Sequence, residues 1–376
     1  MSSILSNPGA LIKGYSLYRT LRDRKSPTGE QALERMVDML PKVSQTYGIT
    51  IPELPIDVRR DLTMAYYAVR YPDIVRDEPR IPEQWRQEAS SHYLNTLSYP
   101  TPENIGEQVE LFKKIKPLEK GFAKLLGKFP VFMQAFQQLP EPVRQSTIKW
   151  TTEMVNGFYM SDLQDIGSIK DYYRRAHYDA GVVGYIITDD FMHRGYISQE
   201  TRDKLMPDPK SEKLGVNLAN DVGVALQYAN DIGDIWDDIR DGIYKWPRIL
   251  LQAQGLDYSS IPNLDLSSEH DRAKGNAILE ELVSDAKPII ISSCKYVEEM
   301  PQDPNGLRNF LNFTIALSAM KLRNSYGLMT PERKIPKDLG EIDQIFHKVR
   351  EIGEQGGDAL PFIQHTLERP AQEFSQ

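Results

Sequence analysis

The segment 226–238 contains the residues whose types and spacing most clearly suggest chemistry. Asn230, Asp234 and Asp238 recur at four-residue intervals, so on an α-helix they share one face, which Gln227 continues. From Gln227 to Asp238 there is no lysine or arginine. Because carboxylates one turn apart repel each other, the pattern predicts a bound cation, and oxygen-only ligands favour Mg²⁺. A solvated acidic helix face is the competing interpretation.

A second acidic pattern lies nearer the N-terminus. Asp73 and Asp77 are four residues apart, and Arg70 precedes Asp73 by one helical turn. Two carboxylates beside an arginine suit a magnesium-bound diphosphate, because a guanidinium binds phosphate oxygens in a forked geometry. Surface ion pairs of Asp73 with Arg70 and Arg76 are the alternative. If both acidic helices face one cavity, they can hold two or three Mg²⁺ ions that neutralise a departing diphosphate.

The elements that must position these residues are predicted to be helices. Apolar residues recur at helical spacing along the chain, and strand signals are scarce. The expected fold is therefore all-α, in a single domain over 29–355, with an N-terminal extension (1–28) and a C-terminal tail (356–376). The predicted helices cover 32–40, 56–77, 106–116, 121–138, 142–160, 169–191, 199–205, 213–241, 269–299, 306–326 and 339–355.

Composition narrows the function classes. The formal net charge of −8 argues against nucleic acid as a partner, since phosphate backbones need clustered cations. The single cysteine, Cys294, excludes disulfides within the chain and is expected to be a small buried residue. No secretion signal or long apolar run is found. We expect a cytoplasmic protein, soluble or at most in peripheral contact with a membrane.

In the order and spacing of its motifs the chain resembles the squalene and phytoene synthases, from about Ser44 to Tyr326. The two acidic patterns occupy the places of the family's two aspartate-rich regions. The further matching segments are Ser44 to Leu54, Ala180-Gly181-Val182-Val183-Gly184 and Trp246-Pro247. The resemblance implies an isoprenoid-synthase (class I terpenoid synthase) helical bundle around a central cavity, Mg²⁺ and an isoprenoid diphosphate substrate.

The resemblance also implies roles for individual residues. The expected metal ligands are Asp73, Asp77, Asn230, Asp234 and Asp238. The substrate-binding residues that it implies are Tyr47, Arg70 and Gln227. Arg240, Lys245 and Arg248 are expected to bind substrate for a different reason, because their positive charges could replace those of missing arginines. The expected catalytic residues are Asp73, Asp77, Asp234 and Asp238. Arg175, at the position of the family's tyrosine, and Tyr178, nearby but out of register with it, are expected to face the reacting carbons.

Five positions depart from the family's pattern. Gly233 and Ile243 stand where it has arginines, and Arg175 stands where it has a catalytic tyrosine. Arg76 replaces the glutamate of the first motif, and Pro72 lies inside a predicted helix, where it favours a kink. No motif assigns a substitute for the missing arginines, although lysine and arginine side chains follow the second motif. These departures weaken the case for holding two diphosphates together.

The sequence therefore favours an enzyme that ionises one allylic isoprenoid diphosphate. The resulting cation would react with a second, different acceptor, such as an aromatic compound, or cyclise. NADPH is not expected. Two alternatives stay open: head-to-head condensation of two prenyl diphosphates, as in squalene or phytoene formation, and a catalytically inactive relative that acts as a binding or assembly protein. Fold alone does not choose between them.

Overall fold

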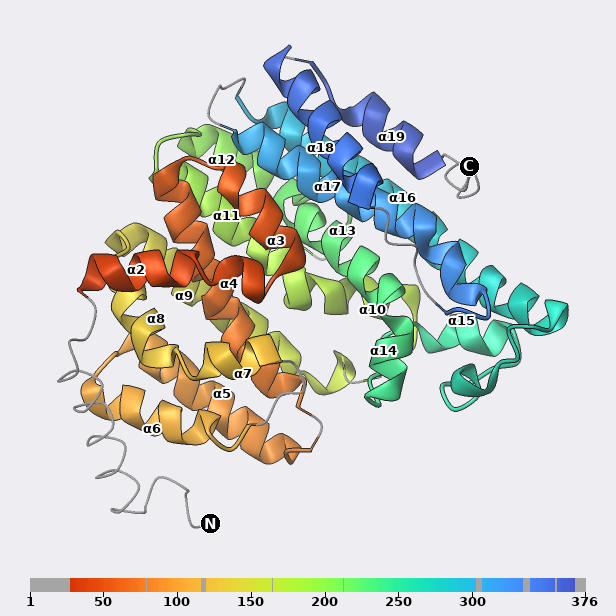
Figure 1. Cartoon of the computed structure of the whole chain (residues 1–376), viewed down its shortest axis with the longest axis horizontal. Helices are drawn as coiled ribbons and strands as arrows, with labels where there is room; N and C mark the ends of the chain where they lie inside the picture. The colour runs from red at the N-terminus through yellow and green to blue at the C-terminus, as the bar shows by residue number, and fades with distance from the viewer. Residues whose placement is uncertain are drawn as a thin grey trace. The chain divides into compact units, whose positions relative to one another are not determined.

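The computed structural model describes residues 28–78, 80–115, 120–163, 165–211, 213–301, 306–333, 339–355 and 357–368. These residues form helices joined by turns and loops, with no β-strand among them, so the predicted all-α class is confirmed. They cluster into two compact units, residues 1–156 and 157–376 (Figure 1). None of the described helices has both the length and the apolar character needed to cross a bilayer.

The first unit is built around helix α4. Its helices are α2 (Gly29–Val37), α3 (Gln45–Thr50), α4 (Ile56–Arg76), α5 (Glu83–Ser98), α6 (Pro102–Phe112), α7 (Lys120–Leu126), α8 (Phe129–Phe136) and α9 (Glu141–Phe158), the last of which continues into the second unit. On α4, Tyr71 stacks on Phe112 with ring centroids 5.4 Å apart and meets Phe129 edge-on at 5.2 Å. This aromatic core ties α4 to α6 and α8.

Pro72 lies within α4 and does not end it. A proline at this position removes the N–H that would bond to the carbonyl of Ala68, one turn earlier. The hydroxyl of the buried Tyr93 on α5 donates to that carbonyl at 2.7 Å instead. The helix therefore continues as far as Arg76 with its orphaned acceptor satisfied.

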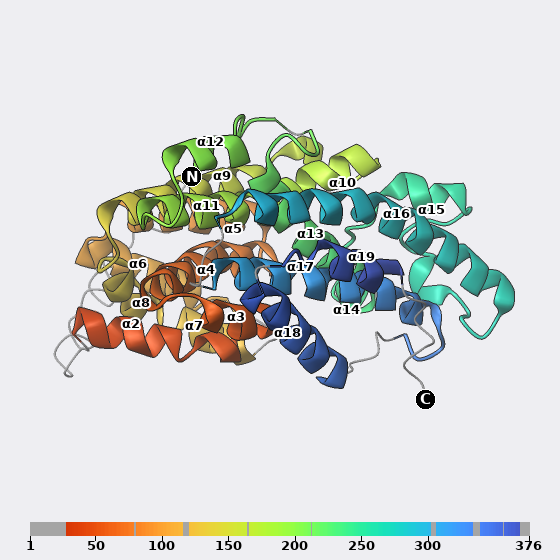
Figure 2. The ribbon, with the colours of Figure 1, turned by 90° about the horizontal axis from the view of Figure 1, so that it is seen from above.

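The second unit is built around helix α13. Its helices are α10 (Ile169–Ala176), α11 (Val182–His193), α12 (Gln199–Leu205), α13 (Leu218–Gly233), α14 (Ile235–Arg240), α15 (Arg248–Ala253), α16 (Glu269–Glu299), α17 (Leu307–Asn324), α18 (Leu339–Glu354) and α19 (Leu360–Glu368), with a π-helical turn (His177–Gly181) joining α10 to α11. Helix α13 packs against α11, α16 and α17, and the last two lie side by side (Figures 1 and 2).

Two glycines allow α13 to approach α11 and the π-helical turn before it closely. A Cβ atom on Gly184 would lie 1.7 Å from the carbonyl oxygen of Ala219, and one on Gly223 would lie 2.0 Å from that of Ala180. Both distances are far below van der Waals contact, so only glycine fits at either position. The Ala-Gly-Val-Val-Gly segment thus has a structural role in this chain, because it sets the spacing between two helices.

The helix predictions differ from the structure in several places. The predicted helix 213–241 is two helices, α13 and α14, which meet at Asp234. The predicted helix 121–138 is also divided, into α7 and α8. The sequence analysis missed α5, whose buried face includes Ser90, His92 and Thr96 and so has little apolar periodicity. It also missed α15, and α19 within the predicted tail. Cys294 is buried, as expected.

Candidate active site

The second acidic region lies where α13 gives way to α14. Asp234 caps both helices, with φ −102° and ψ 10°, so the predicted stripe bends at its middle residue. The ammonium of Lys321, on α17, lies 3.1 Å from Asn230 Oδ1 and 3.1 Å from Asp234 Oδ1. Two predicted metal ligands therefore converge on one point, and a lysine nitrogen occupies it.

A second lysine bridges the other side of this region. Lys245 Nζ lies 3.2 Å from Asp231 Oδ1 and 3.2 Å from Asp238 Oδ2. Burial raises the pKa of Asp238 to about 7, against the opposing effect of Lys245. Burial also raises the pKa of Asp231, again opposed by Lys245. The ammonium group thus offsets only part of the cost of burying two carboxylates together.

The Trp-Pro motif holds Lys245 in place. The Trp246 indole is buried, and its Nε1 donates to the Asp231 carbonyl at 3.2 Å. The carbonyl of Trp246 accepts a 2.6 Å hydrogen bond from the Tyr258 hydroxyl. Because Trp246 is fixed at both ends, the preceding residue is held against the acidic region.

The π-helical turn places further charge near Asp231. Arg175 Nε donates to both carboxylate oxygens of Asp179, at 3.0 and 3.1 Å, and Arg175 Nη1 donates to the Leu163 carbonyl at 3.1 Å. Asp179 raises and Arg175 lowers the pKa of Asp231, after the larger effects of burial and Lys245. Arg175 thus contributes to the electrostatics of the acidic region while its guanidinium is bound to Asp179.

Tyr178 lies in the same turn. Its ring meets the His177 imidazole edge-on, with centroids 4.6 Å apart. It also packs directly over Gly157, where a Cβ atom would come within 2.1 Å of the ring. The His177 ring is itself held by a 2.6 Å hydrogen bond to Asn220 Oδ1. A catalytic role for Tyr178 stays a prediction.

The predicted substrate-binding residues of this unit have different surroundings. Gln227 Nε2 donates to Asp231 Oδ1 at 2.8 Å, so it belongs to the acidic region. Arg240 pairs with the exposed Asp237 at 2.8 Å. Arg248 pairs with Asp165 at 2.7 Å. Among the residues that the structure describes, neither arginine pairs with a predicted metal ligand, whereas Lys245 pairs with Asp238.

The first acidic region, on α4, forms an alternating chain of opposite charges. Asp73 Oδ1 accepts from Arg76 at 2.7 Å, and its other oxygen accepts from Arg70. Arg76 Nε donates in turn to Asp77 Oδ1 at 2.8 Å. The arginine that replaces the expected glutamate therefore separates the two predicted metal ligands. The sequence left these ion pairs open as a surface alternative, but Asp73 and Arg76 are buried here.

The remaining predicted residue of the first unit is Tyr47, on α3. Its ring lies 5.4 Å from that of Tyr66 on α4. Burial raises the pKa of the Tyr47 hydroxyl, so this group is neutral at physiological pH. Tyr47 could donate a hydrogen bond to a phosphate in that state, and its binding role stays a prediction.

The donor atoms of the second acidic region suit Mg²⁺ in kind. All are oxygens, and Asn230 and Asp234 already converge on a cationic nitrogen. Nearby, the buried Tyr172 hydroxyl has no hydrogen-bond partner among the described residues. No cluster of three or more acidic, histidine or cysteine side chains within those residues is arranged as a metal site. Mg²⁺ commonly takes only one or two protein carboxylates and completes its shell with phosphates and water.

The model of the squalene/phytoene synthase family matches residues 40–320, which include both acidic regions and the π-helical turn. The chain belongs to this family. Among its relatives are the Botryococcus squalene synthase of Botryococcus braunii (26% identical over 243 residues, 62% of this chain and 46% of the relative) and squalene synthase BSS of the same organism (24% over 337 residues, 87% and 66%). The squalene synthase of Schizosaccharomyces pombe is 26% identical over 227 residues (58% and 45%).

Solved structures agree with the family's fold. The structure of TcSQS with the ligand BPH1237 matches with a TM-score of 0.71 at 20% identity, over 91% of this chain and 93% of that one. A dehydrosqualene synthase in complex with a ligand matches with a TM-score of 0.57 at 14% identity, over 87% and 98%. At these identities the likeness establishes the fold. The chain spans about half to two thirds of the length of the squalene synthases named above.

Sequence reasoning missed three residues of this family member's acidic region. Lys321 is 87 residues from Asp234 in the chain, and no local pattern links the two. Asp179 lies in a π-helical turn that helical periodicity does not predict. Asp231 had a signal, because it lies seven residues before Asp238 and shares its helix face. The lack of cations in the local sequence was thus no guide to the charges around the motif.

Proposed function

We propose that this chain is a Mg²⁺-dependent prenyltransferase that condenses two isoprenoid diphosphates head to head and releases diphosphate. Membership of the squalene/phytoene synthase family supports this reading over the one-diphosphate chemistry that the sequence favoured. The structural observation that carries it is the pair of lysines in the second acidic region. The missing arginines at Gly233 and Ile243 were the reason to doubt that two diphosphates could be held, and Lys321 and Lys245 bring two positive charges to that region.

In this proposal Asn230, Asp234 and Asp238 hold magnesium, with Asp73 and Asp77 as the ligands of the first acidic region. Bound Mg²⁺ would supply Lewis-acid stabilisation of the departing diphosphate. Lys321 and Lys245 each carry three N–H donors for phosphate oxygens. Arg70 offers a guanidinium for the same purpose. Gln227 orients Asp231 through its 2.8 Å hydrogen bond.

A second candidate is transfer of a single prenyl group to a different acceptor, or its cyclisation. The observation that favours it is Arg175, which stands in place of the family's catalytic tyrosine and is bound to Asp179. A cationic guanidinium is a poor replacement for a neutral hydroxyl beside a developing carbocation, because like charges repel. Under this candidate the lysines would bind one diphosphate only.

The test is incubation of the purified chain with Mg²⁺ and geranyl, farnesyl or geranylgeranyl diphosphate, with and without NADPH. Diphosphate release and product mass are measured. A hydrocarbon or alcohol containing two prenyl groups supports the proposal. Release that gives only prenyl alcohols or a cyclic terpene supports the second candidate. No release with any substrate would support the catalytically inactive alternative.

Matched variants test the site itself. Asp234→Asn and Asp238→Asn should each slow diphosphate release about 100-fold or more, since metal-assisted charge stabilisation is worth several kcal/mol. Asp237→Asn is the control, because Asp237 lies on the same helix with an exposed side chain that pairs only with Arg240 among the contacts described. Equal effects of all three substitutions would refute the assignment of the metal ligands.

A further inference from the structure

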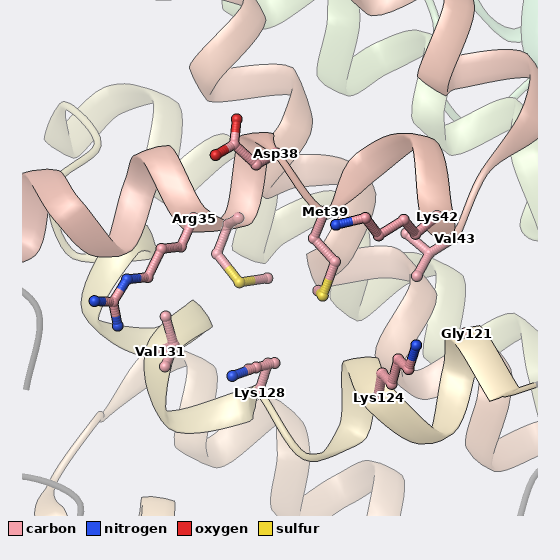
Figure 3. A pocket seen from close by; sticks show the side chains of 10 residues that line it. Arg35, Asp38, Met39, Lys42, Val43, Gly121, Lys124, Lys128 and Val131 are labelled. Atoms are coloured by element: carbon pink, nitrogen blue, oxygen red, sulfur yellow. The ribbon is translucent and has the colours of Figure 1, made fainter.

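A cavity of about 560 Å³ lies within the first unit, and no carboxylate of either acidic region is among its lining residues. It is bounded by α2, the turn Leu40–Lys42, α7 and α8 (Figure 3). This volume is typical of small-molecule sites. Part of the lining is apolar and comes from Met36, Met39, Val43 and Val131. Methionine side chains adapt readily to the shape of a flexible apolar ligand.

The rest of the lining is strongly basic. Four cationic side chains contribute to it: Arg35, Lys42, Lys124 and Lys128. The single acid in the lining, Asp38, directs its carboxylate away from the cavity, whereas Lys42 and Lys124 extend into it (Figure 3). No ion pair joins any of the four cations to another described residue. The concentration of positive charge is unexpected in a chain whose formal net charge is −8.

Helix dipoles account for only part of this charge. Arg35 and Lys124 lie in the last turns of α2 and α7, where cations are favoured. Lys128 is the residue immediately before α8, at the positive end of that helix, where a cation is disfavoured. Lys42 belongs to a three-residue turn, which has almost no dipole. Four like charges around one cavity repel one another, and an anion would relieve that repulsion.

We propose that this cavity binds a single amphiphilic anion, an isoprenoid phosphate, with its head group on the lysines. The apolar chain would lie along Met36, Met39, Val43 and Val131. The concave lining suits an individual molecule rather than a bilayer surface. The isoprenoid nature of the chain rests on the proposed function. The site itself needs no metal, because its lining contains no carboxylate directed inward.

The test uses the full chain in EDTA, so that magnesium-dependent binding is absent. Farnesyl monophosphate, below its aggregation concentration, is titrated by calorimetry, with farnesol and inorganic phosphate as separate probes. We expect one farnesyl monophosphate to bind per chain. Farnesol, which lacks the phosphate, and inorganic phosphate, which lacks the apolar chain, should each bind at least about tenfold more weakly. Equal affinity for farnesol would overturn the role of the cations.

Paired variants locate the site. Lys124→Met/Lys128→Met should weaken binding about tenfold or more while circular dichroism and thermal melting stay unchanged. Lys113→Met/Lys114→Met removes the same charge at the end of α6 and should leave binding intact. Unchanged affinity in the first pair, or equal losses in both, would overturn the inference.

Two further results distinguish a single bound molecule from a membrane surface, and this inference from the proposed function. Vesicles containing phosphatidylglycerol serve as a separate probe. If the chain binds these vesicles but not monomeric farnesyl monophosphate, and Lys124→Met/Lys128→Met abolishes the vesicle binding, the result would identify a membrane surface and overturn the proposed ligand. Failure of the proposed function appears as absence of Mg²⁺-dependent diphosphate release, whereas failure of this inference appears as absence of binding in EDTA.

Discussion

At the residue scale, the second acidic region has lysines placed among its carboxylates. Lys321 contacts Asn230 and Asp234, and Lys245 contacts Asp231 and Asp238. An ammonium group that bridges two oxygens occupies the position that a bound metal ion would need. In the proposed site, lysine and Mg²⁺ therefore compete for the same ligands, and the lysine is available to phosphate oxygens once displaced.

Replacement of Lys321 by methionine should tighten Mg²⁺ binding. Removing a neighbouring positive charge favours a cation, and a partly exposed ion pair is worth about 1 kcal/mol, or roughly fivefold in affinity. Magnesium-dependent thermal stabilisation measures this, because a ligand that binds the folded state raises the melting temperature. Lys287→Met, on the exposed face of α16, is the control and should have no effect. Weaker Mg²⁺ binding in Lys321→Met would contradict the assigned competition.

The buried Asp221 should make stability depend on pH. Burial raises its pKa above the usual 3.8, although hydroxyls of Ser292 and Tyr173 and the N–H of Gly215 donate to it. Above about pH 4 the unfolded chain loses this proton while the folded chain keeps it, so the free energy of unfolding falls as pH rises through the raised pKa.

Asp221→Asn should reduce that decline, because asparagine does not titrate. Urea unfolding between about pH 4 and pH 8 measures the slope. Glu281→Gln, an exposed position on α16, should leave the slope as it is. A slope that is identical in Asp221→Asn and the unmodified protein would mean that Asp221 titrates normally.

At the element scale, two local features position the helices that carry the acidic residues. Tyr93 supplies the hydrogen bond that Pro72 removes from α4. Gly184 and Gly223 let α13 approach α11 and the π-helical turn until backbone meets backbone. The first device keeps the Asp73 face helical, and the second sets the position of the helix that carries Asn230.

A double-mutant cycle tests the Tyr93–Pro72 relation. Tyr93→Phe should destabilise the fold by about 1–3 kcal/mol, because the buried Ala68 carbonyl is left without a donor. In a Pro72→Ala background the restored N–H can bond to that carbonyl, so the same substitution should cost less. Urea unfolding of the four proteins gives both values. Equal costs in the two backgrounds would show that the hydroxyl does not compensate for the proline.

At the scale of the whole molecule, the predicted C-terminal tail includes part of the fold. Helix α19 packs against α17, the helix that carries Lys321, and Ile363 on α19 is fully buried. The apolar contacts of α19 therefore stabilise the helix that supplies one of the two lysines. The boundary predicted at 355 would separate these two elements.

Ile363→Ala should destabilise the second unit by about 2–5 kcal/mol, the usual cost of removing a large buried side chain. Chemical unfolding followed by circular dichroism measures it. His365→Ala, two residues along and exposed, should change stability by less than about 0.5 kcal/mol. A similar small effect at Ile363 would mean that α19 contributes little to the fold.

Local physics explains which features the sequence could predict. Helical periodicity predicted α4, α12 and α16 closely, because apolar side chains on one face report burial directly. It failed for α5, because polar side chains (Ser90, His92 and Thr96) make up half of its buried residues. The spacing of the acidic motifs likewise predicted their common faces, and the order of motifs predicted the family.

The sequence by itself determined the all-α class, the family and the positions of the carboxylates, since each depends on residues close together in the chain. Only the tertiary structure decided what neutralises those carboxylates. Lys321 reaches Asn230 and Asp234 from another helix, 87 residues beyond Asp234 in the chain. Electrostatic interactions act through space over a few ångströms, so residues far apart in the chain set the charge of the site, and no local pattern records them.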